Sequence, residues 1–165
     1  MSKLVKLQAS DDLISTQEIS IESIILSDTI KNMLDDLGSD LSAGSELPTI
    51  PLCNVTSKVL TKTIQYCDYY LVNKPKQLDD KKISNEITPW EIEFCNIDQK
   101  NLFELILAAN YLNIQPLLDL TCKTVANMIR GKTPEEIRKT FNIKNDFTPE
   151  EEEKVRKDNE WCEER

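Results

Sequence analysis

Histidine is absent from the 165-residue sequence, and this absence excludes several kinds of chemistry. Without an imidazole the chain has no Ser-His-Asp or Cys-His pair, no histidine general base and no histidine metal ligand. No two of its five cysteines lie within three residues of each other, so there is no C-x-x-C redox or zinc motif. We therefore expect no enzyme, no cofactor and no metal site, and we expect reduced thiols, several of them packed in the core.

Positive charge and long apolar runs are also scarce. The chain has 20 Lys and Arg against 29 Asp and Glu, a net charge of −9. An acidic field repels phosphate backbones and anionic lipid, so nucleic acid and membrane surfaces are not expected as partners. The apolar stretches, such as residues 102–112, are too short and too interrupted to span a bilayer. A hydrophobic content of 39% still indicates a folded, soluble protein.

Hydrophobic spacing in the first third of the chain predicts a small sheet. Residues 3–8 and 13–21 indicate two strands. Residues 49–53 indicate a third, placed at an edge because Pro51 has no N–H to donate to a ladder. Residues 39–49 and 73–87 are expected to form mobile loops, because the first is rich in small and acidic residues and the second is strongly polar.

The rest of the sequence is typical of helices. Apolar periodicity predicts a helix at 29–38 capped by Ser27 or Asp28, one at 55–71 capped by Asn54, and others at 98–112 and 116–129. The pattern T-P-x-E begins at Thr88, Thr133 and Thr148 and predicts three helix starts with a capping box. Apolar residues surround the helices at 98–112 and 116–129, as in central core helices. The fold class is therefore α+β and mainly helical.

The tail, residues 132–165, has too few apolar residues to fold as an isolated helical segment. A last helix over about 149–163 would offer only Val155, Trp161 and Cys162 as apolar anchors. The segment therefore needs a surface to dock on, either its own domain or a partner. The periodicity leaves open whether Trp161 packs on the chain's own core or anchors a partner.

Several strings in this sequence are more specific than composition. Residues 98–152 closely resemble the S-phase kinase-associated protein family, the adaptors of SCF ubiquitin ligases, as do 29–38, 50–60 and 159–165. The resemblance implies a BTB/POZ-type fold over residues 1–131, with a small N-terminal sheet, and added C-terminal helices over 132–165. It also implies a non-catalytic adaptor that joins a cullin to F-box substrate receptors for ubiquitination, in the cytoplasm and the nucleus.

The resemblance also implies partners and contact residues. The direct partners are F-box proteins and a cullin. The indirect partners are a RING protein and a ubiquitin-conjugating enzyme. The unpartnered chain is expected to form a weak homodimer. Asn110 and Tyr111 match the family's cullin-contacting pair, and Pro149 matches a proline that some protist relatives hydroxylate and glycosylate. The residues that match the F-box-binding surface are Leu102, Phe103, Leu118, Val125, Ile129, Ile137, Phe141, Ile143, Phe147, Val155, Trp161 and Cys162. For Leu102 through Ile129, core packing is the alternative role.

Three other functions are alternatives to the adaptor. An elongin C-like subunit shares the fold, but that family ends near Gly131, so residues 132–165 argue against it. A different non-catalytic helical interaction module is also compatible with the composition. A thiol enzyme using Cys122 or Cys162 lacks a histidine partner and a glycine-rich oxyanion loop.

Overall fold

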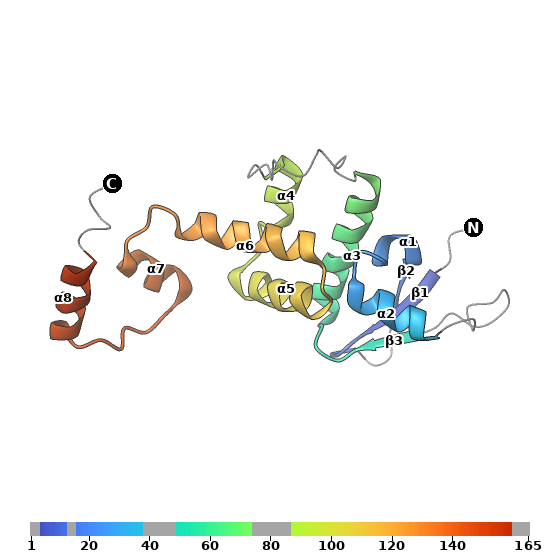
Figure 1. The fold of residues 1–165 in the computed structure, drawn as a ribbon, viewed down its shortest axis with the longest axis horizontal. Coiled ribbons are helices and arrows are strands. Elements are labelled where there is room, and N and C mark those ends of the chain that lie inside the picture. Colours follow the sequence, from blue (N-terminus) through green and yellow to red (C-terminus); the bar gives the residue numbers. More distant parts are fainter. Residues whose placement is uncertain (1–3, 13–15, 38–48, 74–86, 160–165) are drawn as a thin grey trace. The chain divides into compact units, whose positions relative to one another are not determined.

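The computed structural model describes residues 4–12, 16–37, 49–73 and 87–159, and every structural statement below refers to these. They form three strands and eight helices (Figure 1). The chain divides into two compact units, Met1–Met128 and Ile129–Arg165, which we call unit 1 and unit 2.

Unit 1 contains the sheet and most of the helices. Its strands are β1 (Leu4–Ala9), β2 (Gln17–Ser20) and β3 (Thr49–Leu52). Its helices are α1 (Ile21–Ile24), α2 (Asp28–Leu37), α3 (Ser57–Val72), α4 (Pro89–Phe94), α5 (Gln99–Tyr111) and α6 (Gln115–Ile129), the last of which ends at the first residue of unit 2. Figure 1 shows the strands with α1 and α2 at one end of this unit and α4–α6 at the other, with α3 between them.

The sheet has the order β2-β1-β3, and it confirms the three predicted strands. β1 pairs antiparallel with β2, Val5 opposite Ile19, and parallel with β3, Leu7 opposite Ile50. Alternate side chains of β1 are buried, as expected for a sheet with one face on the core. The predicted edge position of Pro51 is confirmed, because β3 pairs only with β1 among the described strands.

Several element boundaries differ from the prediction. The last helix, expected over about 149–163, ends at Asp158, with Asn159 as its C-cap. The expected strand 13–21 ends at Ser20, because the Ser20 hydroxyl accepts the Ser23 amide at 3.1 Å and so starts the short helix α1. The helix expected from residue 55 begins at Ser57 instead, because Val55 is 1% exposed and its carbonyl accepts the Ser10 amide and hydroxyl.

The cap of α3 is also not the predicted Asn54. Its N-cap residue is Thr56, whose side chain makes no capping bond. The carboxylate of Asp11 instead accepts the Ser57 amide at 2.6 Å and the Ser57 hydroxyl at 3.0 Å. A carboxylate from the segment after β1 therefore satisfies a free N–H at the first turn of α3.

The other predicted helix starts agree with the structure. Thr88, Thr133 and Thr148 each form a full capping box with the glutamate three residues later, and Asp98 caps α5. Of the two candidates for α2, Ser27 is the cap, since its hydroxyl accepts the Ile30 amide at 3.2 Å.

The core of unit 1 is formed by the sheet and the inner faces of α1, α2, α3, α5 and α6. Its largest fully buried side chains are Leu7, Ile24, Ile30, Leu52, Leu60, Leu102, Leu105, Leu112, Ile114, Leu117, Val5 and Val55. The expectation that the helices at 98–112 and 116–129 are buried all round is wrong. Leu107 of α5 is 67% exposed and Ile129 of α6 is 38% exposed, so each helix buries only part of its surface.

Unit 2 contains α7 (Pro134–Phe141) and α8 (Pro149–Asp158). Neither helix has a buried residue, which agrees with the thin apolar content predicted for the tail. The predicted domain boundary after residue 131 lies close to the division between the units. Of the predicted loops, most residues of 39–49 and 73–87 lie outside the described part of the chain; Thr49 belongs to β3, and Ile87 packs against the core.

Candidate partner-binding surfaces

One side of α5 carries an exposed strip of side chains. The helix faces the core with Leu105, Ala108 and Ala109, all of them buried. Phe103, Leu107 and Asn110 follow the spacing i, i+4, i+7, so they lie on the same face, and all three are exposed. The predicted cullin residue Asn110 therefore shares a face with the predicted F-box residue Phe103, about two helical turns away.

Leu107 is a candidate that sequence reasoning missed. It is 67% exposed and lies between Phe103 and Asn110 on this strip. The sequence signal was present, since a leucine at i+4 from Phe103 and i−3 from Asn110 must share their face of a helix. An isolated exposed leucine needs no explanation, but one in a continuous strip with an exposed phenylalanine is a candidate contact.

The second member of the predicted cullin pair is less accessible. Tyr111 is half-buried and packs against the core of unit 1. Its backbone is held from α2, because the Thr29 hydroxyl donates to the Tyr111 carbonyl oxygen at 3.0 Å. The pair therefore combines an exposed amide with a tyrosine of fixed position at the end of α5.

The predicted F-box residues of unit 1 differ in exposure. Phe103 is 42% exposed, while Leu118 and Val125 are half-buried. Leu102 is 1% exposed, so here it is a core residue with almost no surface for a partner to touch. The reason is geometric, because Leu102, Leu105 and Ala109 are spaced i, i+3, i+7 and lie on the buried face of α5.

The predicted residues of unit 2 are more accessible. Ile129 is 38%, Ile143 55%, Phe147 51% and Val155 43% exposed, and Ile137 and Phe141 are half-buried. Phe147 and Val155 line a hollow of about 370 Å³ together with residues of α7. Unit 2 thus offers apolar side chains in a concave setting. Trp161 and Cys162 lie outside the described residues.

Two polar side chains hold Glu152 of α8, one from α7 and one from the segment between the two helices. The Arg138 guanidinium donates to the Glu152 carboxylate at 2.6 Å, and the Asn145 amide donates to the same group at 3.3 Å. These hydrogen bonds lower the pKa of Glu152. Because α7 and α8 bury no residue, their mutual arrangement depends strongly on such polar contacts.

Pro149 is the first residue of α8 and is exposed. Its ring lies at a helix position where the missing N–H leaves no hydrogen bond unmade. The predicted modification would therefore add a group at the surface of unit 2 without breaking the backbone bonding of α8.

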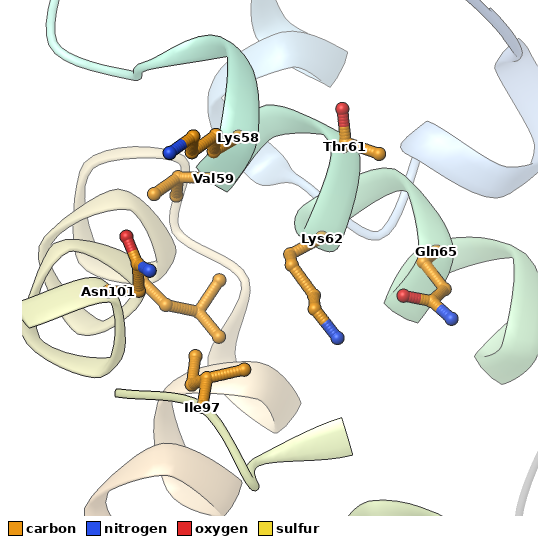
Figure 2. Close-up of a pocket in the computed structure, with 8 residues that line it drawn as sticks. Lys58, Val59, Thr61, Lys62, Gln65, Ile97 and Asn101 are labelled. Atoms are coloured by element: carbon orange, nitrogen blue, oxygen red, sulfur yellow. The ribbon is translucent and has the colours of Figure 1, made fainter. Parts of the chain in front are cut away.

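Unit 1 has a separate hollow of about 370 Å³ between α3 and the start of α5. Figure 2 shows α3 residues on one side and Ile97 and Asn101 on the other. The lining residues are Lys58, Val59, Thr61, Lys62, Gln65, Ile97, Asn101 and Leu105. None of them is a predicted partner residue, and none carries a carboxylate or a thiol, so the hollow contains no acid–base or thiol–base pair.

The four described cysteines are free thiols in two kinds of environment. Cys67 and Cys95 are buried, which confirms that some cysteines pack in the core, whereas Cys53 and Cys122 are exposed. Burial raises the pKa of both core thiols, that of Cys67 to about 12. Over the described ranges there is no cluster of three potential metal-ligating side chains, and no helix combines the length and apolar character needed to cross a bilayer.

Comparison with known proteins gives the family. Residues 3–72 match the model described as Skp1 family, tetramerisation domain, and residues 115–162 match Skp1 family, dimerisation domain. The first match identifies the small sheet and its helices as a BTB/POZ-type fold, as predicted.

Close relatives match along almost their whole length. SCF ubiquitin ligase complex proteins SKP1b and SKP1a of Dictyostelium discoideum are each 58% identical over 98% of this chain and 97% of their own. A Skp1-related protein of Caenorhabditis elegans is 52% identical over 96% of this chain and 91% of its own. The chain belongs to the Skp1 family.

Proposed function

We propose that this protein is the adaptor subunit of an SCF ubiquitin ligase. It binds a cullin through the end of α5 and the F-box of a substrate receptor through residues of α5, of α6 and of the tail at 132–165. The bound receptor is thereby held on the cullin, which recruits a RING protein and a ubiquitin-conjugating enzyme. The protein itself forms and breaks no covalent bond, and it acts in the cytoplasm and the nucleus.

The observation that carries the proposal is the family relationship over the whole chain. Relatives named as SCF ubiquitin ligase complex proteins are 58% identical over 98% of it, so the match includes both the sheet and the tail. The exposed apolar side chains of α5 and unit 2 supply the kind of surface that a protein partner covers. We propose that the two binding sites divide along the chain, with the cullin site in residues 1–131 and the completion of the F-box site in residues 132–165.

The elongin C-like alternative is disfavoured by the same comparison. The Skp1 family match at 115–162 extends well beyond Gly131, where an elongin C-like chain is expected to end. A thiol enzyme would use Cys122 or Cys162, and it is disfavoured because the sequence contains no histidine to act as the base for either thiol.

Stepwise assembly tests the proposal. The full chain is mixed with an F-box fragment, passed over a sizing column, and then combined with a cullin N-terminal domain. We expect a binary and then a ternary complex of defined stoichiometry. Failure of both partners to bind the folded chain would exclude the adaptor role.

The double variant Asn110→Ala with Tyr111→Ala separates the two sites. It should lose the cullin and keep the F-box fragment, because it changes side chains at one end of α5 only. Loss of both partners, with unchanged unfolding, would show that the two sites are not separate.

Self-association is expected to compete with the F-box fragment. Apolar surface such as Phe147 and Val155 can be covered by a second copy at high concentration. Sedimentation of the unpartnered chain should show a weak dimer that an equimolar F-box fragment dissociates. A dimer that keeps its affinity when the fragment is bound would place self-association elsewhere.

Pro149 is also proposed as a site of hydroxylation followed by glycosylation. Its exposure at the start of α8 leaves it accessible to a modifying enzyme. Mass spectrometry of the peptide from protein isolated from its own cells should show the added groups, and Pro149→Ala should remove them.

A further inference from the structure

The end of α5 is held by the start of α2, although the two segments are more than eighty residues apart in the sequence. The Thr29 hydroxyl donates to the Tyr111 carbonyl oxygen at 3.0 Å. The Ser27 hydroxyl donates to the Leu112 carbonyl oxygen at 2.5 Å. Tyr111 is the last residue of α5 and Leu112 is its C-cap, so neither carbonyl has an amide partner further along the helix.

A third bond lies next to the first two. The side-chain amide of Asn113 donates to the Asp28 carboxylate at 2.9 Å. Asn113 has a left-handed backbone, with φ of 50°, so α5 ends at this point and its final carbonyls become available to α2. The three bonds join the successive residues 27–29 of one segment to the successive residues 111–113 of the other.

The contact ties two helix ends together. Ser27 is fully buried, and its hydroxyl accepts the Ile30 amide as the cap of α2 while it donates to the end of α5. The start of one helix and the end of the other therefore cannot move independently without leaving a buried hydroxyl or carbonyl unpaired. Asn110 and Tyr111 belong to the turn of α5 that this contact fixes.

We propose that Thr29 and Asp28 are positioning residues for the Asn110–Tyr111 cullin site. Thr29 holds the backbone of Tyr111 itself, and Asp28 holds Asn113, the left-handed residue that follows the end of α5. By fixing this turn before the partner arrives, they reduce the ordering that cullin binding requires. The inference rests on the proposed function, because it takes Asn110 and Tyr111 to contact the cullin.

The test uses Thr29→Val, which keeps the side-chain shape and removes the hydroxyl donor, and Thr29→Ser, which keeps the donor. We expect Thr29→Val to weaken cullin binding about five- to tenfold, as loss of one hydrogen bond does. Its affinity for an F-box fragment should stay within about twofold of that of the unmodified chain, and Thr29→Ser should restore cullin binding. Titration calorimetry of the full chain with each partner measures all of these affinities.

A matched control removes a similar bond elsewhere. The buried Thr63 hydroxyl of α3 donates to the Val59 carbonyl at 2.9 Å, so Thr63→Val loses a hydroxyl–carbonyl bond away from the end of α5. Thr63→Val should leave cullin affinity unchanged even where it lowers the unfolding temperature. Equal losses of cullin affinity in Thr63→Val and Thr29→Val would overturn the positioning role, because both would then act through stability.

Coupling gives a readout that a purely structural role does not move. In a Tyr111→Ala background the side chain to be positioned is missing, so adding Thr29→Val should weaken cullin binding by less than about twofold. Full additivity of the two changes would overturn the proposal.

If Tyr111→Ala and Asn110→Ala themselves leave cullin binding intact, the proposed cullin site fails. If they weaken cullin binding while Thr29→Val has no effect, only the positioning role fails.

Discussion

The thiol of Cys67 is buried in the core of unit 1, where it is 1% exposed. Desolvation, aided by the charge of Asp68, raises its pKa from the usual value near 9 to about 12. The folded chain therefore keeps this thiol protonated at pH values where the unfolded chain ionises it. Since the folded pKa is the higher one, the stabilisation is complete below pH 9 and decreases as the pH rises from about 9 towards 12.

We expect this residue to make the chain less stable in alkali. Between pH 8 and pH 10 the Cys67 thiol should lower the free energy of unfolding by about 1 kcal/mol, because only the unfolded form loses its proton. Urea unfolding at both pH values measures the decrease. Cys67→Ala should reduce the difference between the two pH values, whereas Cys53→Ala, at an exposed thiol, should leave it unchanged. Equal differences in all three proteins would contradict the burial argument.

Helix α8 shows what a helix requires when it buries nothing. None of its residues is buried, so its stability comes from the Thr148–Glu151 capping box, the Arg138–Glu152 pair and local propensity. Isolated helices of this length are marginal in water. Each cap or ion pair is therefore a large fraction of what holds α8 in its helical form.

Removal of this cap should loosen α8. Thr148→Ala is expected to cost about 1 kcal/mol of local stability, so amide exchange in α8 should become about fivefold faster. Thr148→Ser keeps a capping hydroxyl and should exchange at nearly the original rate. Hydrogen exchange measured by mass spectrometry checks both variants. An unchanged rate in Thr148→Ala would show that the helix does not depend on its cap.

On the scale of the whole molecule, the proposed function requires two sites that can be disabled one at a time. Trp161→Ala should weaken F-box binding by about 2 kcal/mol or more, the size of effect seen for an aromatic interface anchor, and should leave cullin binding unchanged. Calorimetry with each partner tests this. Unchanged F-box affinity would remove the tail from the receptor-binding surface.

Leu107→Asp is a second test at this scale. The leucine is 67% exposed, so the change should not disturb folding, but it introduces a charge between Phe103 and Asn110. We expect at least tenfold weaker binding of one partner, because a partner covering this strip would bury an unpaired carboxylate. Full affinity for both partners would show that the strip between the two sites remains exposed in the complex.

The sequence by itself determined the features that depend on neighbouring residues. The three capping boxes and the Asp98 cap each involve atoms within four residues, so local chemistry is sufficient to predict them. The edge position of Pro51 follows from its missing N–H, and the long matching strings gave the family.

Only the tertiary structure decided the features that join distant segments. Asp11 caps α3 in place of Asn54, Ser27 and Thr29 hold the last carbonyls of α5, and Leu102 turns inward while Leu107 turns outward. For the hydrogen bonds, the partner atom belongs to another element. For the two leucines, apolar periodicity does not say which side of a helix the rest of the chain will cover. Packing makes that choice, because the core covers one side of α5 and leaves the strip with Leu107 exposed.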